Sequence, residues 1–221
     1  MINWNDIDTV LLDMDGTLLD LNYDNHFWLQ YLPAAYARAR GLSLDNGRAE
    51  LLGKLDSRRG QLAWYCLDHW SEQLQMDIPA LKREIRHMIR IRPFALEFLQ
   101  RLYAGPRTTV LVTNAHPVTL DIKMGEIDIR PWFDHVVVSH QYDAAKEQRV
   151  FWERLQSEYP FDPARTLFID DTESVLDTAR EYGIGHLLTL LQPDSGISKR
   201  IDTRFPGIHH FDEIMPEGLP A

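Results

Sequence analysis

The sequence predicts a doubly wound, Rossmann-like α/β fold, in which a helical cap is inserted after the first strand of a parallel sheet core. Three observations support this fold class. Short apolar segments of strand length alternate with helical segments in the second half of the chain. Several strand segments are almost continuously apolar, as is typical of buried parallel strands. The stretch 21–90 has helical periodicity and no convincing strand.

The expected elements follow in order along the chain. The strands are Thr9–Asp13, Thr108–Thr113, His135–Ser139, Thr166–Ile169 and Gly185–Leu190. The helices outside the insertion are Phe94–Tyr103, Pro117–Ile127, Lys146–Tyr159 and Thr172–Tyr182. A proline in the first turn of one helix and Gly183 after another are ordinary helix boundaries. Prolines and glycines punctuate the tail from Gln192 onward, which we expect to cover the surface.

These elements predict two domains. Residues 1–20 and 91–221 form the α/β core, and residues 21–90 form the helical cap. The cap holds most of the aromatic side chains, and Arg92-Pro93 ends it.

The composition narrows the functional class. The chain has 221 residues, of which 44% are hydrophobic and 25% charged, as in soluble globular domains. Its net charge is −10 and it has no basic block, which argues against a nucleic-acid partner. No stretch approaches the ~18–20 apolar residues of a membrane span. These features, with no signal-like N-terminal segment, predict a cytoplasmic protein without a membrane partner, and they do not indicate an oligomeric state.

Cys66 is the single cysteine, so no disulfide can form within the chain. This fits a reducing compartment. Its apolar and aromatic neighbours predict a buried thiol that packs rather than reacts.

The first strand ends in the segment Asp13-Met14-Asp15-Gly16-Thr17. Two carboxylates one residue apart lie on the same side of a strand. Such a pair suits a hard cation such as Mg²⁺, and it also supplies a nucleophile and an acid/base group. Gly16 allows a sharp turn where a ligand approaches closely. An acidic turn after a strand would be the ordinary structural explanation.

Three later segments follow the ends of other strands. They are Thr113-Asn114, Lys146 and Asp170-Asp171. Alone, each has an ordinary explanation: a polar turn, a solvated lysine at a helix start, or an acidic helix N-terminus. Ligands bind outside the carboxyl ends of strands in such sheets, so we expect these residues to meet Asp13.

The ordered set of Asp-x-Asp, Thr/Asn, Lys and Asp-Asp resembles the haloacid dehalogenase superfamily of phosphohydrolases, in the subgroup with a helical cap after the first motif. Longer stretches in the cap, core and tail are similar to the bacterial GMP/IMP nucleotidase group. They are Asp13-Met-Asp-Gly-Thr-Leu-Leu-Asp-Leu21, Asn25 with Phe27-Trp28, Trp64-Tyr-Cys-Leu-Asp68, Trp70-Ser-Glu-Gln-Leu74, Thr113-Asn-Ala-His-Pro117 and Pro193-Asp-Ser-Gly-Ile197.

The resemblance implies a phosphatase acting through an aspartyl-phosphate, with a purine nucleoside 5′-monophosphate such as GMP or IMP as its small-molecule partner. Asp13 would be the nucleophile, Asp15 the general acid and base, and Lys146 the compensating charge. The implied Mg²⁺ ligands are Asp13, Asp171, the main-chain carbonyl of Asp15, and Asp170 through a water. The implied phosphate-binding residues are Met14, Gly16, Thr113, Asn114 and Lys146.

Two positions depart from the family pattern. Lys146 is followed by Glu147, where relatives often have proline. Val175 stands four residues after the last motif aspartate, where many relatives carry Asp or Asn. Support for the acids must then come from elsewhere, with Asp170, Thr172 and Glu173 as candidates.

Cap and loop residues are candidates for substrate contact as well as for packing. The residues that could face the site are Tyr23, Asp24, Asn25, His26, Trp28, Trp64, Tyr65 and His116. An aromatic among them could stack on a base.

Other functions use the same motifs in part. A phosphatase for another small ester, such as a sugar phosphate or phosphoglycolate, shares all of them. A phosphomutase keeps the first motif, and product analysis separates it. A dehalogenase needs no Mg²⁺, and Asp15 with Asp170-Asp171 argues against it. A non-catalytic binding protein on this fold would usually have lost the nucleophile or the acids, and this chain has them all.

Overall fold

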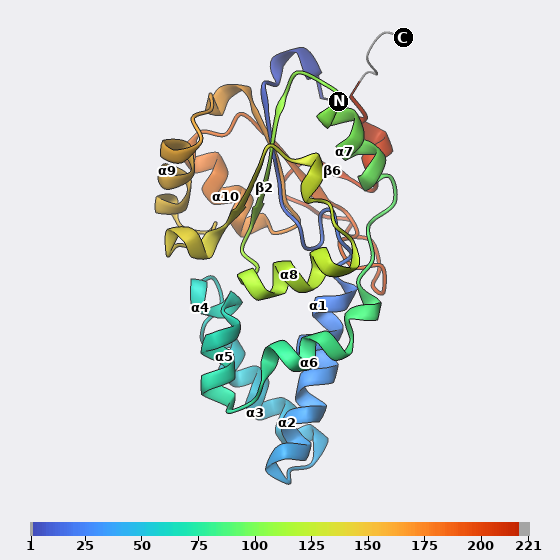
Figure 1. Cartoon of the computed structure of the whole chain (residues 1–221), viewed down its shortest axis with the longest axis vertical. Coiled ribbons are helices and arrows are strands. Elements are labelled where there is room, and N and C mark those ends of the chain that lie inside the picture. Colours follow the sequence, from blue (N-terminus) through green and yellow to red (C-terminus); the bar gives the residue numbers. More distant parts are fainter. Residues whose placement is uncertain (1, 217–221) are drawn as a thin grey trace.

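The computed structural model describes residues 2–216 and contains a six-stranded parallel sheet (Figure 1). The strand order is β3-β2-β1-β4-β5-β6. The strands are β1 (Thr9–Leu12), β2 (Thr108–Thr113), β3 (His135–Val138), β4 (Thr166–Ile169), β5 (His186–Leu190) and β6 (Gly207–Ile208). The doubly wound α/β fold that the sequence predicts is confirmed.

Alternate residues of each strand face two separate cores. On β1, Val10 and Leu12 join one core and Leu11 joins the other, as the two-residue period of a strand requires. Helices α7 (Ala95–Tyr103) and α8 (Pro117–Glu126) cover the first face, with Phe98 among their buried residues. Helices α9 (Arg149–Glu158) and α10 (Glu173–Tyr182) cover the second, with Trp152 buried beneath them.

The segment between β1 and α7 is helical and lies beyond α8, below the sheet in Figure 1. Its helices are α1 (Asn22–His26), α2 (Leu32–Arg40), α3 (Leu44–Asp56), α4 (Leu62–Tyr65), α5 (Leu67–Leu74) and α6 (Ile78–Glu84), and η2 (Phe27–Tyr31) is a π-helical segment between α1 and α2. Leu19 and Ile91 form an isolated antiparallel bridge, so the chain leaves and rejoins the core at one place. This helical insertion, residues 21–90, is called the cap below.

Short 3-10 helices complete the described chain. They are η1 (Trp4–Asp6), η3 (Arg86–Met88), η4 (Arg130–Trp132), η5 (Ser139–Tyr142), η6 (Pro163–Arg165) and η7 (Phe211–Ile214).

The structure corrects three sequence predictions. Lys146 does not open a helix: it lies in a turn, and α9 begins at Arg149. The tail contributes a sixth strand, because Gly207–Ile208 pairs in parallel with β5. A two-residue strand is too short to give a periodic signal, and its pairing depends on the neighbouring strand. Cys66 is half-buried at the start of α5, not inside the apolar core of the cap.

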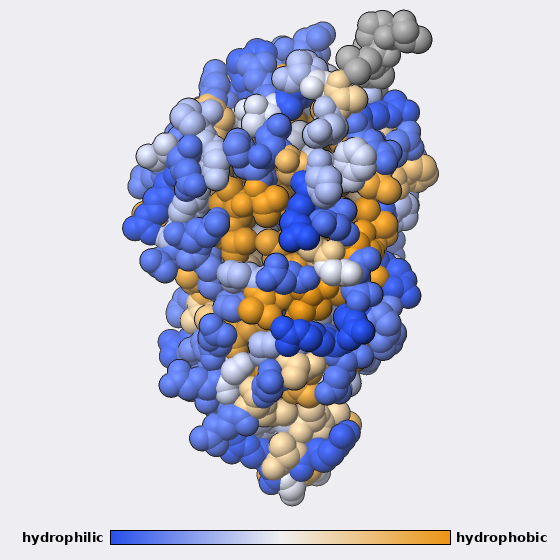
Figure 2. Space-filling model, viewed as in Figure 1, coloured by the Kyte–Doolittle hydropathy of each residue, from blue (hydrophilic) through white to orange (hydrophobic). Residues whose placement is uncertain are grey.

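The distribution of apolar residues on the molecule follows this architecture. In the view of Figure 2, apolar residues gather at the middle of the molecule around α8, and most of the rim is hydrophilic. Among the described residues, no helix is both long and apolar enough to cross a membrane.

Candidate active site

The sheet order places the acidic motifs side by side. Strand β1 lies between β2 and β4, and Leu12 is in register with Leu111 and Ile169. The next residue on β1, Asp13, therefore stands beside the end of β4, and its main-chain N–H donates to the Ile169 carbonyl at 3.0 Å. Asp170 follows immediately. Parallel pairing thus brings together two motifs that are far apart in the sequence.

Lys146 is the cation at the centre of this group. Its Nζ donates to Asp13 Oδ1 at 2.6 Å, to Asp170 Oδ2 at 2.7 Å, and to the Val112 carbonyl at 3.1 Å. All three charged side chains are buried. Burial opposes the charged lysine, but the two carboxylates outweigh it and raise the pKa of Lys146. Lys146 is therefore a fixed positive charge beside Asp13.

Three buried acids lie close enough to share one cation. Asp13, Asp170 and Asp171 each offer a carboxylate oxygen, and these oxygens lie within 4.8 Å of one another. Burial raises the pKa of Asp13 and Asp171 to about 7 and that of Asp170 to about 6. Asp13 Oδ2 is buried and has no hydrogen-bond partner among residues 2–216. An unpartnered buried carboxylate oxygen and a surplus of negative charge fit a hard divalent cation such as Mg²⁺.

Neighbouring groups orient Asp171 and Asp170. Thr172 Oγ1 donates to Asp171 Oδ1 at 3.2 Å, and the Thr172 N–H donates to Asp170 Oδ1 at 2.8 Å. Arg200 Nη1 donates to the Asp171 carbonyl at 2.7 Å. Glu173 instead pairs with Arg204 at the surface. Thr172 thus supplies the support expected at this motif, and Glu173 does not.

Gly16 permits the close packing of the first motif against the last. Its φ of +83° lies in the left-handed region, and a Cβ there would lie 2.7 Å from the Asp171 carboxyl carbon. Neither Gly16 nor Met14 lines the cavity described below. The Met14 side chain is wholly buried, so this residue can reach a phosphate with its main chain alone.

The side chain of Asn114 holds the turn that carries Lys146. Its Oδ1 accepts from the Lys146 N–H at 2.9 Å, and its Nδ2 donates to Glu147 Oε2 at 2.9 Å. The Tyr65 hydroxyl donates to Glu147 Oε1 at 2.6 Å, which links the cap to the core. Thr113 Oγ1 accepts from the Ala115 N–H at 3.0 Å. Glu147 is therefore a contact between the core and the cap.

A second buried lysine holds Asp15. Lys123 Nζ, on α8, donates to Asp15 Oδ1 and to Asp24 Oδ2 of the cap. Lys82 Nζ donates to the other oxygen of Asp24 at 2.9 Å. Burial raises the pKa of Asp15, whereas the two lysines overcome burial and hold that of Asp24 at about 2. An ion network thus joins Asp15 to two cap elements.

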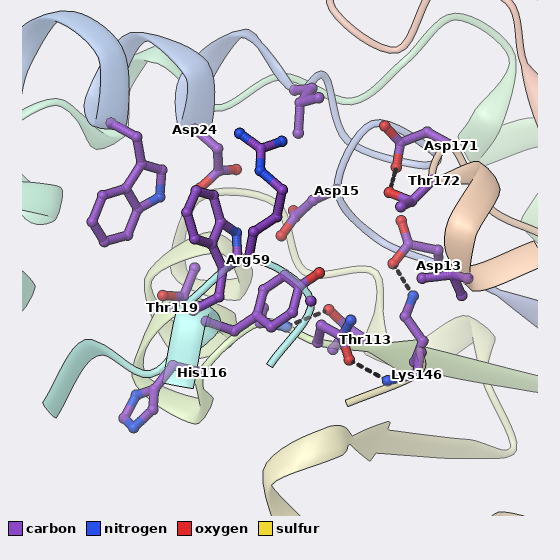
Figure 3. Close-up of a pocket in the computed structure, with 18 of the residues that line it drawn as sticks. Asp13, Asp15, Asp24, Arg59, Thr113, His116, Thr119, Lys146, Asp171 and Thr172 are labelled. Atoms are coloured by element: carbon purple, nitrogen blue, oxygen red, sulfur yellow. Dashed lines mark hydrogen bonds and ion pairs between the residues drawn. The ribbon is translucent and has the colours of Figure 1, made fainter. Parts of the chain in front are cut away.

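A cavity of about 520 Å³ lies between the acids and the cap. In Figure 3, Asp13, Lys146 and Asp171 lie on one side of this pocket, Asp24 and Arg59 on the other, and Asp15 between them. The cap and loop candidates that line it are Asp24, Asn25, Trp28, Trp64, Tyr65 and His116. Tyr23 and His26 do not line it, and the Tyr23 hydroxyl donates to the Lys82 carbonyl inside the cap.

Sequence reasoning missed Lys123, Lys82 and Arg59. None belongs to a motif. The two lysines reach the site through tertiary packing, whereas the Arg59 side chain is 73% exposed and forms an ion pair with Asp56. The sequence offered one sign that Lys123 is buried. It follows Leu120 by three residues, so the two lie on the same face of α8, among apolar neighbours. A lysine on a buried helix face needs an ionic partner.

With this geometry in place, comparison with known proteins defines the class. Residues 7–183 match the family model for haloacid dehalogenase-like hydrolases. The chain is 36% identical to GMP/IMP nucleotidase YrfG of Escherichia coli strain K12, over 97% of each chain. The chain belongs to the haloacid dehalogenase-like hydrolase family and is a phosphoric monoester hydrolase.

Solved structures share the fold at lower identity. A HAD phosphatase from Thermococcus onnurineus matches with a TM-score of 0.75 at 19% identity, covering 94% of this chain and 96% of that one. L-2-haloacid dehalogenase from Xanthobacter autotrophicus matches with a TM-score of 0.57 at 16% identity, covering 84% and 78%. These similarities confirm the predicted fold, and the phosphatase and the dehalogenase show that it serves more than one chemistry.

Proposed function

We propose that the chain is a Mg²⁺-dependent phosphatase that hydrolyses purine nucleoside 5′-monophosphates, with GMP and IMP as its substrates. The observation that carries this proposal is one cavity lined both by the buried cluster of Asp13, Lys146, Asp170 and Asp171 and by an aromatic wall, which consists of Trp28, Trp64 and Tyr65. The cluster suits a phosphate and a metal, and the aromatic wall suits a flat base. Similarity to a GMP/IMP nucleotidase along almost the whole chain supports the choice of base.

Asp13 would act as the nucleophile. A carboxylate oxygen of Asp13 attacks phosphorus, the bond from phosphorus to the 5′ oxygen breaks, and an aspartyl-phosphate forms. Lys146 already occupies Asp13 Oδ1, whereas Oδ2 has no hydrogen-bond partner among the described residues. Oδ2 is therefore the better candidate for the attacking or metal-binding oxygen.

Asp15 would transfer the protons. Its raised pKa favours a carboxyl group that still holds a proton to give to the leaving 5′ oxygen. The ionised Asp15 then takes a proton from the water that attacks the aspartyl-phosphate, and phosphate is released with Asp13 regenerated. Lys123, which donates to Asp15, would hold this carboxyl in place.

The acids would hold Mg²⁺ through the carboxylates of Asp13 and Asp171 and the main-chain carbonyl of Asp15. Because Lys146 engages Asp170 at 2.7 Å, Asp170 is better placed to support the site than to bind the ion directly. The bound ion would neutralise charge between the nucleophile and the phosphate dianion.

The aromatic wall of the cavity would hold the nucleoside. Trp28 and Trp64 offer faces for stacking, and the Arg59 guanidinium lies 5.3 Å from the centre of the Trp64 ring. Arginine matches the O6 and N7 acceptors that guanine and hypoxanthine share. Arg59 would therefore favour 6-oxopurines over adenine.

Phosphate release from a panel of esters tests the proposal. The panel holds GMP, IMP, AMP, a pyrimidine nucleotide, ribose 5-phosphate, phosphoglycolate and pyridoxal phosphate, with Mg²⁺ present. We expect GMP and IMP to be turned over fastest, and Asp13→Asn or EDTA to abolish release. Faster turnover of a base-free ester would retain the chemistry and contradict the purine assignment. Transfer of phosphate to a second hydroxyl instead of water would contradict hydrolysis.

A further inference from the structure

A second cluster of metal-ligating side chains lies where the cap meets the core. Cys66 precedes α5 in the cap, His116 precedes α8, and His140 belongs to η5 after β3. Each of the three offers one ligand atom, and these atoms lie within 4.8 Å of one another. The proposed hydrolysis does not use Cys66 or His140, so their convergence has no explanation in that mechanism.

His140 is the least satisfied member of the cluster. Both of its ring nitrogens are buried, and neither has a hydrogen-bond partner among residues 2–216. Its ring meets the His116 ring edge-on, with the ring centres 5.0 Å apart. Burial, and then the nearby His116, lower the pKa of His140 to about 4. The ring is therefore neutral near pH 7, which leaves a nitrogen lone pair without a proton or a donor.

Cys66 lies at the start of α5, where its sulfur accepts a hydrogen bond from the main chain. The donor is the His69 N–H, at 3.4 Å from Cys66 Sγ. Burial lowers the pKa of His116, so this ring is also neutral near pH 7. Asp68 Oδ2 lies 3.5 Å from His116 Nε2, and its side chain is 80% exposed. The Asp68 carboxylate or a water can therefore supply a fourth metal ligand from the solvent side.

We propose that Cys66, His116 and His140 form a transition-metal site, for which Zn²⁺ is the best match, and that Asp68 or water is the fourth ligand. A thiolate with two imidazoles is a set that Zn²⁺ prefers and that Mg²⁺ avoids. Because Cys66 belongs to the cap and both histidines to the core, a bound ion ties the cap to the core. The site is separate in chemistry from the three carboxylates around Asp13.

Binding requires small and defined changes. Tetrahedral bonds of about 2.3 Å to sulfur and about 2.1 Å to nitrogen place the ligand atoms about 3.5 Å apart. Because these atoms already lie within 4.8 Å of one another, each pair closes by at most about 1.3 Å. Cys66 releases its thiol proton to solvent. His116 Nδ1 now accepts from the Val118 N–H at 3.3 Å. With the metal on Nε2, the ring proton moves to Nδ1 and this long hydrogen bond is lost.

Cobalt titration of the full chain tests the site. The protein is treated with a chelator, dialysed, and titrated with Co²⁺ in excess Mg²⁺, which occupies carboxylate sites. We expect one Co²⁺ per chain, with the visible bands of a tetrahedral ion and a sulfur-to-cobalt charge-transfer band. Because Cys66 is the single cysteine, that band reports this position alone. Zn²⁺ should abolish both signals by displacement and should raise the melting temperature.

Variants separate coordination from loss of folding. Cys66→Ser should lose the charge-transfer band, His140→Gln should weaken Co²⁺ binding at least tenfold, and the metal-free melting temperature should stay near that of the unmodified chain. The exposed His87 provides a control, and His87→Gln should keep the bands and the Zn²⁺ shift. Absence of tetrahedral bands at stoichiometric Co²⁺, or unchanged bands in folded Cys66→Ser, would overturn the proposal.

Discussion

Lys123 Nζ donates hydrogen bonds to the carboxylates of Asp15 and Asp24, so one buried ammonium joins the first motif to the first helix of the cap. Lys123 comes from α8, which lies between the sheet and the cap in Figure 1. The position of the cap and the orientation of Asp15 are thereby coupled. If Asp15 is the general acid, Lys123 is a positioning residue.

Replacing Lys123 tests this coupling. Lys123→Met should lower kcat for GMP by roughly 10²-fold, the smaller end of what a general acid supplies. The loss should be much smaller for p-nitrophenyl phosphate, whose leaving group needs no proton. Lys123→Arg should recover part of the activity. Lys54, a surface lysine of the cap, is the control, and Lys54→Met should leave both rates unchanged. Equal losses for the two substrates would show a merely structural role.

Gly41 provides a matched control for a substitution at Gly16 in the first motif. Both have positive φ, but a Cβ at Gly16 would lie 2.7 Å from the Asp171 carboxyl, whereas nothing lies within 4 Å of one at Gly41. Gly41→Ala should cost about 1–2 kcal/mol of stability from backbone strain and leave activity intact. Gly16→Ala should add the clash and lose most activity. Denaturant unfolding and phosphate release measure the two effects. Comparable activity in both variants would contradict the close packing at Asp171.

Mg²⁺ binding should depend on pH. Burial raises the pKa of Asp13 and Asp171 from 3.8 to about 7. Groups with a raised native pKa retain protons that the unfolded chain has lost, so the metal-free protein loses stability as pH rises from 3.8 towards 7. Mg²⁺ needs the ionised forms, and it also relieves their repulsion.

The melting temperature with and without saturating Mg²⁺ measures this linkage. The increase should be larger at about pH 8 than at about pH 5, because protons compete with the ion at the lower pH. Asp171→Asn should abolish most of the increase. The same increase at both pH values would mean that the raised pKa values do not control the metal site.

Trp64 should determine affinity for the base. It lines the cavity, and stacking on an aromatic is worth about 1–3 kcal/mol. Trp64→Ala should therefore raise KM for GMP by a factor of about 5 to 150. It should change KM for ribose 5-phosphate little. Trp4, which packs on Phe98 in the core, is the control, and Trp4→Ala should not discriminate between the substrates. Equal changes for the two esters in Trp64→Ala would place the base elsewhere.

Much of the fold was readable along the chain, because its signals are local. Five strands fall within one residue of the predicted bounds, since apolar runs and the turns that end them are written into neighbouring residues. Lys146 was misplaced onto a helix because its turn is held from outside, by the side chain of Asn114. The sixth strand was missed because Gly207–Ile208 becomes a strand only by pairing with β5.

The sequence by itself determined the alternation of strands and helices, the place of the insertion and the order of the acidic motifs. These follow from residue type and spacing, which act over a few residues. Tertiary structure alone decided that Lys123 meets Asp15, that Tyr65 meets Glu147, and that Cys66 meets two histidines. The second and third of these contacts join the cap to the core, and Lys123 also reaches the cap through Asp24. Such contacts depend on how two packed units are oriented, and no periodicity within either unit encodes that orientation.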